Sequence, residues 1–156
     1  MTDAPLPNAL SKLLETRDWL MADGATGTTL FNMGLSSGDA PELWNVDKPE
    51  NITRLYLGAV EAGSDIFLTN SFGGTASRLK LHKSEHRVHE LNKAAAEIGR
   101  NVADRAGRVV IVAGSMGPTG EIMEPMGPLS YSAAVEMFHE QAEGLKAGGA
   151  DVAWVE

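Results

Sequence analysis

Seven residues of this sequence could hold a small charged molecule, and all lie at the ends of short apolar runs. They are Asp23, Gly24, Ala25, Thr26, Asn70, Ser115 and Glu156. Two carboxylates suit an ammonium group, whereas the backbone N–H groups of a glycine-rich turn at a helix start suit a carboxylate or a phosphate. No lysine or arginine stands in the segments WLMADGATGTTLF, LTNSFGG, VAGSMGPTG and DVAWVE. These residues therefore predict a site for a zwitterion such as an amino acid.

The apolar runs that carry these residues recur at a constant spacing. They lie near Ala22, Asp65, Arg108 and Asp151, so that successive runs are 43 residues apart. Three of the four follow an Ala-Gly pair, and glycine at that place is typical of a helix end before a strand. The spacing predicts four short strands that are separated by helices.

Helical periodicity fills the intervals between the runs. Apolar residues recur on one face over residues 49–63, 84–107 and 130–148, with Asp47 as the expected cap of the first helix and Pro49 in its first turn. Leu10, Leu13 and Leu14 predict a leading helix within residues 1–18. Strands that alternate with helices form a parallel sheet, because each return connection is a helix.

Two architectures fit this alternation, namely an open doubly wound sheet and a closed barrel. The sequence ends at a fourth apolar run that no helix follows. A free-standing sheet with an apolar edge strand of this kind would be prone to association. We therefore expect the first four βα-type units of a (β/α)8 TIM barrel, truncated at strand 4, with residues 1–18 as a leading segment and residues 19–156 as the half-barrel domain. The open edge also makes a homo-oligomer possible.

Composition excludes several classes of function. The net charge of −8 argues against binding to nucleic acid or to an anionic membrane surface. No apolar run approaches the length of a membrane span, and the first residues do not resemble a secretory signal, so a cytoplasmic location is expected. The chain has no cysteine, which excludes disulfides and thiolate metal sites within it.

Two other features have competing interpretations. His82, His86 and His89 have helical spacing, but they stand in a charged stretch, KLHKSEHRVHEL, so a solvated face is favoured over a metal site. Trp44, in a loop flanked by acids, is either a packing anchor or a ring face for a methylated ammonium group. Both interpretations of Trp44 stay open at the level of the residues.

The sequence resembles the homocysteine S-methyltransferase family over nearly its whole length. The resemblance is carried, in order, by MADGATGTTL, PENITRLYLGAVEAGSDIFLTNSFGG, VAGSMGPTGEIM and EGLKAGGADVAWVE. It implies a (β/α)8 barrel that transfers a methyl group to the sulfur of homocysteine and so forms methionine. By position, Asp23 and Glu156 would hold the ammonium group of homocysteine, and the backbone of residues 24–26 would hold its carboxylate. Asn70 and Ser115 would line the same pocket.

The resemblance also implies a zinc ion that binds the homocysteine sulfur. Its thiolate ligands come from a Gly-x-Asn-Cys motif and a Gly-Gly-Cys-Cys-Gly motif in the second half of the family's barrel, and this chain has neither. We therefore expect no metal ligands within residues 1–156. The piece alone should be inactive, with the C-terminal half of the barrel as its partner.

Among methyl donors, Trp44 favours betaine or a similar onium compound, while methylcobalamin and S-methylmethionine remain open. Two alternatives to the methyltransferase are a half-barrel scaffold that pairs with another chain and a different TIM-barrel lyase or isomerase that acts on a small acid.

Overall fold

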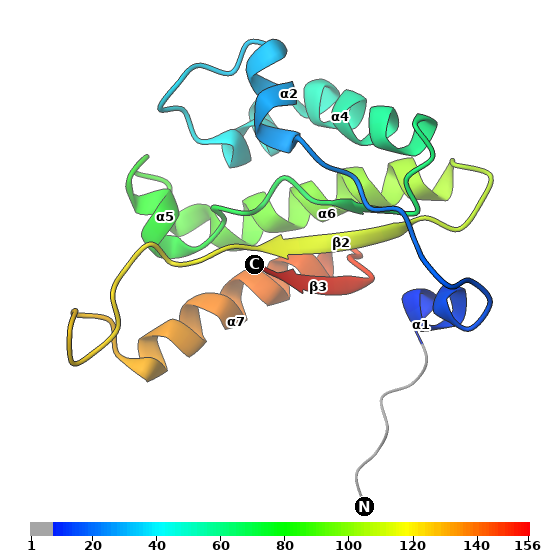
Figure 1. The fold of residues 1–156 in the computed structure, drawn as a ribbon. Helices are drawn as coiled ribbons and strands as arrows, with labels where there is room; N and C mark the ends of the chain where they lie inside the picture. Colours follow the sequence, from blue (N-terminus) through cyan, green and yellow to red (C-terminus); the bar gives the residue numbers. More distant parts are fainter. Residues whose placement is uncertain (1–7) are drawn as a thin grey trace, which may run out of the picture.

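The computed structural model describes residues 8–156 as a small parallel sheet with helices packed on it (Figure 1). The strands are β1 (Ile66–Leu68), β2 (Ile111–Met116) and β3 (Val152–Val155). The helices are α1 (Ala9–Leu14), α2 (Thr26–Asn32), α3 (Trp44–Asp47), α4 (Pro49–Glu61), α5 (Ala76–Lys80), α6 (Val88–Asp104) and α7 (Tyr131–Ala147), with 3-10 turns η1 (Pro41–Leu43) and η2 (Glu85–Arg87). The part of the expected leading segment before residue 8 lies outside the described residues. Among residues 8–156, none of the helices combines the length and the hydropathy that a membrane span requires.

The three strands are parallel and lie in the order β1-β2-β3. Ile66 pairs with Ile111, and Ala113 pairs with Val152, so each strand lies beside its successor in the sequence. Each connection between them contains a helix, as parallel pairing requires. The expected α/β fold with a parallel sheet is therefore confirmed.

The first expected strand is wrong as a strand, because it is reduced to one bridge between Ala22 and Ile66. On both sides of this bridge, side-chain carboxylates accept hydrogen bonds that backbone carbonyls would accept in a continuous strand pair. Asp65 Oδ2 accepts a hydrogen bond from the Met21 N–H at 3.0 Å, and Asp23 Oδ1 accepts one from the Leu68 N–H at 3.1 Å. Since side chains satisfy these amides, the segment stays beside β1 without a continuous backbone ladder.

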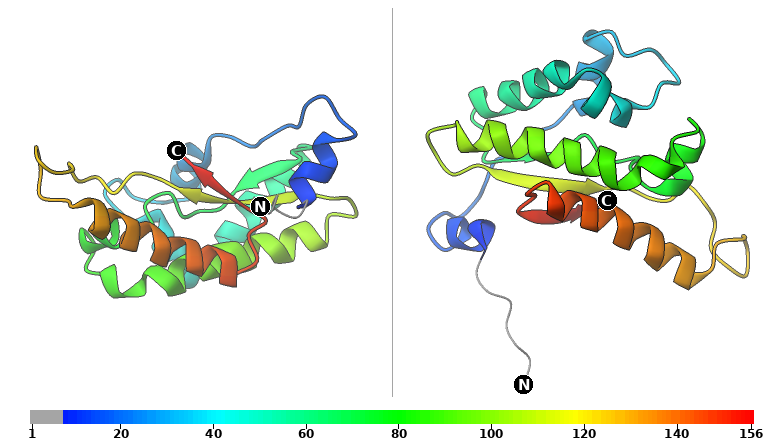
Figure 2. Two further views of the ribbon diagram at one scale, coloured as in Figure 1. Left: turned by 90° about the horizontal axis from the view of Figure 1, so that it is seen from below. Right: turned by 180° about the vertical axis from the view of Figure 1, so that it is seen from behind.

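Helices α4, α6 and α7 form a layer against one face of the sheet (Figure 2). Their apolar stripes explain this position, because residues three or four apart share a helix face. In α6 the buried stripe includes Val88, Leu91, Ala95 and Val102. The three long helices expected from periodicity are thus confirmed.

The expected cap of α4 is wrong. Asp47 is the last residue of α3, and α4 begins after Lys48, which makes no side-chain cap. Because α3 precedes α4 almost directly, Asp47 is already helical and does not have the extended backbone of a capping residue. Pro49 does occupy the first turn of α4, where its missing N–H costs nothing.

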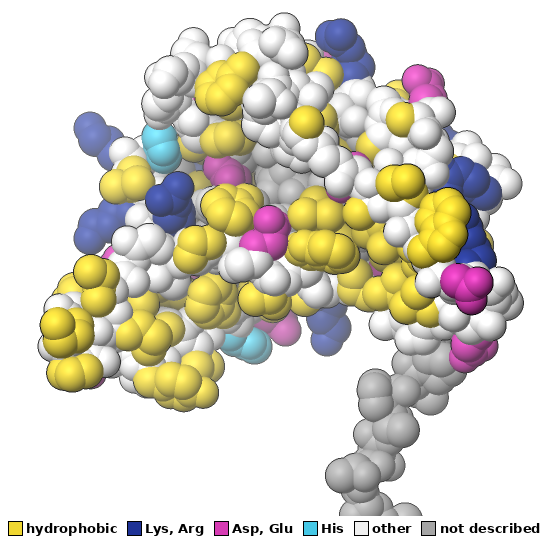
Figure 3. All heavy atoms as spheres, viewed as in Figure 1, with side chains coloured by type: hydrophobic (Ala, Val, Ile, Leu, Met, Phe, Trp, Pro, Cys, Tyr) yellow, Lys and Arg dark blue, Asp and Glu magenta, His cyan; other side chains and the backbone are white. Residues whose placement is uncertain are grey.

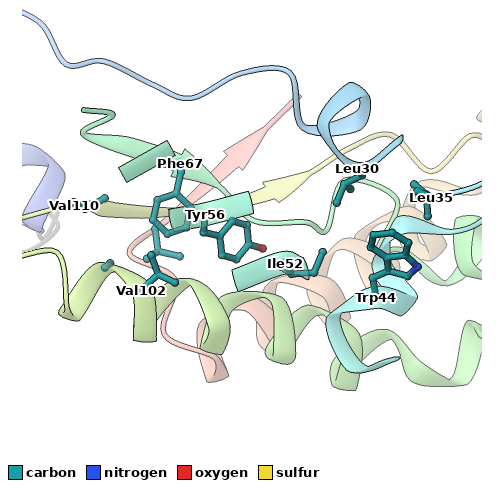
Figure 4. Close-up of a cluster of buried hydrophobic side chains, with 10 residues drawn as sticks. Leu30, Leu35, Trp44, Ile52, Tyr56, Phe67, Val102 and Val110 are labelled. Atoms are coloured by element: carbon teal, nitrogen blue, oxygen red, sulfur yellow. The ribbon is translucent and has the colours of Figure 1, made fainter. Parts of the chain in front are cut away.

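The main core lies between this helical layer and the sheet (Figure 4). Tyr56 of α4 stacks on Phe67 of β1 with ring centroids 4.8 Å apart. Ile52 and Leu30 are fully buried nearby, and Trp44 is 6% exposed at one end of the cluster. Because these aromatic and branched side chains are buried together, they stabilise the packing of α3 and α4 against β1.

The opposite face of the sheet is apolar at one end and polar at the other. Alternate residues of β2 point to this face, and Ile111 and Ala113 pack there with Leu10 and Leu13 of α1. Leu14 is 52% exposed and does not belong to this contact. Two residues after Ala113 the same alternation brings Ser115 to the polar end.

Candidate functional site

A cleft of about 560 Å³ opens at the carboxyl ends of the strands. In Figure 3 the surface is hollowed between α2 and the sheet, with acidic side chains beside the hollow. All seven residues that the sequence singled out for substrate binding line this one cleft: Asp23, Gly24, Ala25, Thr26, Asn70, Ser115 and Glu156. The volume falls in the range of small-molecule sites.

Asp23 is held in place by the neighbouring strand. Its backbone N–H donates to the Ile66 carbonyl at 2.9 Å, and its Oδ1 accepts from the Leu68 N–H. Burial raises the pKa of Asp23 above its ordinary value, and the nearby Glu156 carboxylate adds to this, while the backbone hydrogen bonds oppose it. The raised pKa marks a carboxylate whose charge is not fully compensated, which a bound cation would correct.

Glu156 follows β3 and is oriented by β2. Its Oε1 accepts a hydrogen bond from the Ser115 hydroxyl at 2.6 Å, and its backbone N–H donates to the Met116 carbonyl. Ser115 is 2% exposed, so its hydroxyl has little freedom to turn elsewhere. Ser115 therefore acts on the cleft by fixing the Glu156 carboxylate.

The turn at residues 24–26 has an unusual backbone. Ala25 adopts a left-handed conformation, with φ 56° and ψ 31°, directly before α2. This conformation costs a non-glycine residue about 1–2 kcal/mol. Successive N–H groups in a turn of this kind form a concave site for an anionic group. A Cβ added at Gly24 would meet no atom within 4 Å, so the turn is open on that side.

Asn70 lies in a turn that the η1–α3 segment holds firmly. Its Nδ2 donates to the Pro41 carbonyl at 2.8 Å and to Asn45 Oδ1 at 2.9 Å, and the Asn70 carbonyl accepts from Asn45 Nδ2. The Tyr56 hydroxyl accepts from the Asn70 backbone N–H at 2.7 Å. Both hydrogens of Nδ2 are used, so only Oδ1 of this side chain remains for a ligand.

Two hydroxyl groups and the Ser115 backbone form a closed set of hydrogen bonds that joins the ends of β1 and β2. The Ser115 N–H donates to Thr69 Oγ1 at 3.0 Å, the Thr69 and Ser71 hydroxyls are 2.6 Å apart, and the Ser71 hydroxyl donates to the Ser115 carbonyl. Gln141 Nε2 donates to the Ser71 carbonyl from α7 below. This buried network fixes the floor of the cleft, because each link has one arrangement that satisfies it.

The side of the cleft formed by η1 and α5 was not predicted from the sequence. Glu42, Asp39, Arg78 and His82 also line it. Glu42 is 6% exposed, and burial raises its pKa. Hydrogen bonds from the backbone N–H groups of Glu42 and Gly73, and then the charges of Arg78 and His82, oppose this rise. Asp39, Glu42 and Arg78 do not follow predicted strands and belong to no motif. The helical spacing of His82 with His86 and His89 indicated a solvated face and not this cleft. The short elements η1 and α5, with the residues that flank them, bring these side chains to the cleft.

Trp44 is not brought to the cleft. Its indole packs in the core with Leu30, Leu35 and Ile52, and Lys48 Nζ lies 4.4 Å from its ring centroid. A ring that is buried and covered by a cation has no free face for a methylated ammonium group. Of the two interpretations of Trp44, the structure supports the packing anchor and not the donor site.

The described residues do not supply a metal site. Within 8–156 there is no group of three or more His, Cys, Asp or Glu side chains that could hold a metal ion, and the whole sequence lacks cysteine. His82, His86 and His89 thus do not form a metal cluster. The residues present do not fit the zinc ion that the resemblance implies.

Comparison with known proteins agrees with the resemblance seen in the sequence. The family model described as homocysteine S-methyltransferase matches residues 20–156. Methionine synthase of Mycobacterium tuberculosis is 33% identical over 146 residues, which is 88% of this chain and 12% of that protein. Methionine synthase of Mycobacterium leprae is 32% identical over 155 residues, which is 92% of this chain and 13% of that protein. The chain therefore spans only a small part of these relatives.

Solved structures match as well. The metallated form of the homocysteine methyltransferase MmuM from Escherichia coli has a TM-score of 0.77 and 28% identity, covering 94% of this chain and 56% of that one. Its oxidized form has a TM-score of 0.76 and 27% identity, covering 92% and 55%. The chain spans about half the length of these enzymes.

Proposed function

Because the chain belongs to the homocysteine S-methyltransferase family, we propose that its cleft binds homocysteine for methylation at sulfur. Asp23 and Glu156 hold the ammonium group, and the backbone N–H groups of residues 24–26 hold the carboxylate. Asn70 Oδ1 lines the pocket, and Ser115 orients Glu156. The observation that carries this proposal is that two carboxylates and an open left-handed turn meet in one cleft.

The charges of the cleft support an amino-acid ligand. An ammonium group placed between Asp23 and Glu156 compensates two nearby negative charges, of which Asp23 has a pKa raised by burial. A ligand with only an anionic group would gain nothing from these acids. The binding should weaken as the pH falls through the raised pKa of Asp23, because protonation removes half of the ammonium site.

Titration calorimetry with residues 1–156 tests the proposal. Homocysteine is compared with 4-mercaptobutanoate, which keeps the thiol and the carboxylate but lacks the ammonium group. In the Asp23→Asn variant we expect homocysteine binding to weaken by about 1.5–3 kcal/mol, the value of a hydrogen bond to a charged group. The affinity for 4-mercaptobutanoate should hardly change. An equal loss for both ligands would contradict the ammonium assignment.

The methyl transfer itself requires more than these residues. The resemblance implies zinc in the whole enzyme, and this chain offers no thiolate for it. We infer that the zinc ligands and the remaining strands of a (β/α)8 barrel come from a C-terminal half. In the described chain β3 pairs only with β2, and Val155 is 77% exposed, which leaves an edge where a further strand could pair.

The methyl donor is not part of the proposal. The preference for betaine depended on the ring of Trp44, and that ring lies in the core. Turnover by the complete enzyme with betaine, S-methylmethionine and methylcobalamin in parallel would identify the donor.

A further inference from the structure

Glu42 is the most deeply buried acid of the cleft lining, and it is not part of the proposed ammonium or carboxylate site. It lies in η1, is 6% exposed, and lines the cleft together with Arg78 of α5. Its Oε1 accepts a hydrogen bond from the Gly73 N–H at 2.7 Å. Burying the Glu42 carboxylate costs solvation free energy, and the hydrogen bond from the Gly73 N–H offsets part of this cost.

The bond between Glu42 and Gly73 belongs to a larger set of contacts. Residues 41–45 also bind the turn through the hydrogen bonds of Asn70 with Pro41 and Asn45. The segment is itself immobilised, because the Trp44 indole packs in the main core. Residues 41–45 therefore form a clamp, which grips the 70–73 turn at its first residue through Pro41 and Asn45 and at its last through Glu42.

The close contact with Glu42 depends on residue 73 being a glycine. A Cβ added there would lie 2.8 Å from Glu42 Oε1, a distance that real Cβ atoms essentially never show. The Glu42 carboxylate therefore lies so close to residue 73 that a side chain at that position would collide with it. Glu42 would lose this contact if its side chain were one methylene shorter, because the segment that carries it cannot move toward the turn.

We infer that Glu42 is a positioning residue, which fixes the 70–73 turn through the Gly73 N–H and so presents Asn70 Oδ1 to the amino-acid ligand. This inference rests on the proposed binding of homocysteine. Glu42 acts through its reach and its acceptor oxygen, and its negative charge is not required.

Two substitutions separate reach from charge. Glu42→Gln keeps the reach and an acceptor oxygen but removes the charge, whereas Glu42→Asp keeps the charge but shortens the side chain. We expect homocysteine to bind Glu42→Gln within about threefold of the unmodified chain and Glu42→Asp about tenfold more weakly, as for the loss of one buried hydrogen bond. Glu61→Gln, at the exposed end of α4, is the matched control and should bind like the unmodified chain.

Calorimetry with homocysteine is combined with hydrogen exchange of the Gly73 amide in the free protein. The amide should stay protected in Glu42→Gln and lose protection in Glu42→Asp, with the amides of β2 unchanged in both. The inference is overturned if Glu42→Gln loses as much affinity as Glu42→Asp, or if Gly73 exchanges equally in both. If the unmodified chain does not bind homocysteine, the proposed function fails, while the exchange data still decide whether Glu42 anchors the turn.

Discussion

Replacing Asp65 by asparagine should lower the free energy of unfolding in a way that depends on pH. The Asp65 carboxylate lies at the amino-terminal end of the sheet and is 5% exposed. It accepts hydrogen bonds from the Met21 N–H at 3.0 Å and from Arg17 Nη1 at 2.7 Å, and Arg108 Nη1 lies 3.5 Å away. Together with the backbone hydrogen bonds between Met21, Asp23 and Ile66, the Asp65 carboxylate ties the chain near Ala22 to β1.

The size of the effect follows from these contacts. Asparagine offers one neutral acceptor, so the bond to Met21 falls from a charged to a neutral hydrogen bond, at a cost of about 1 kcal/mol. The ion pair with Arg17 is lost as well, but that side chain is 41% exposed, so this adds only about 0.5–1 kcal/mol. A total near 2 kcal/mol should shift the urea midpoint by about 1 M for a chain of this size.

The dependence on pH gives the sharper test. The Met21 N–H, followed by Arg17 and Arg108, holds the pKa of Asp65 below its ordinary value against the effect of burial. Its stabilisation is therefore complete above the pKa of the unfolded chain and is lost as the pH falls through the lower pKa of the folded state. Urea unfolding from pH 7 downward should show the difference between the variant and the unmodified chain shrinking in acid.

A matched control is Asp104→Asn, which removes an acid paired with Arg100 but 64% exposed. It should change stability by no more than about 0.5 kcal/mol. The reasoning is refuted if Asp65→Asn costs no more than this control, or if its cost is the same at pH 7 and in acid.

Three further substitutions test other parts of the structure. Ser115→Ala should weaken homocysteine binding about fivefold by calorimetry, since Glu156 is exposed and water replaces part of the lost hydrogen bond; an unchanged affinity would mean that Ser115 does not orient it. Trp44→Ala should lower the free energy of unfolding by about 3–5 kcal/mol in urea, and a loss below 1 kcal/mol would contradict its role as a core anchor. Gly74→Ala places a Cβ 2.5 Å from a buried amide and should cost about 1–3 kcal/mol in thermal unfolding, whereas Gly58→Ala, an open helical site, should be neutral or stabilising.

The sequence predicted the parts of the fold that depend on periodicity. The stripe of α6 and the 43-residue spacing are repeated over many residues, so a single exception does not hide them. The residues at the strand ends were found for the same reason, because the carboxyl ends of parallel strands meet at one edge of the sheet. This is why Asp23, Asn70 and Ser115 line one cleft.

Features that depend on single contacts were not predictable. The segment around Ala22 reads as a strand, but the carboxylates of Asp23 and Asp65 take over hydrogen bonds that a strand would make. From the sequence alone, Trp44 could equally be a packing anchor or a ring that binds a methylated ammonium group, and only its neighbours in the structure distinguish the two. Glu42 lies in the three-residue turn η1, which is too short to show a period that would link the residue to its place in space.

The alternation along β2 makes the sheet register a determinant of which side chains face the cleft. Ala113 and Ser115 share one face, while Gly114 faces α7, where an added Cβ would lie 3.0 Å from Leu145. Insertion of one residue ahead of Gly114 would turn the hydroxyl toward the helices and put another side chain in the cleft. The pairing of Ser115 with Trp154 and of Met116 with Val155 also sets how far β3 advances before Glu156. Recognition of the proposed ligand would thus depend partly on backbone pairing, which a screen of side-chain substitutions alone would not detect.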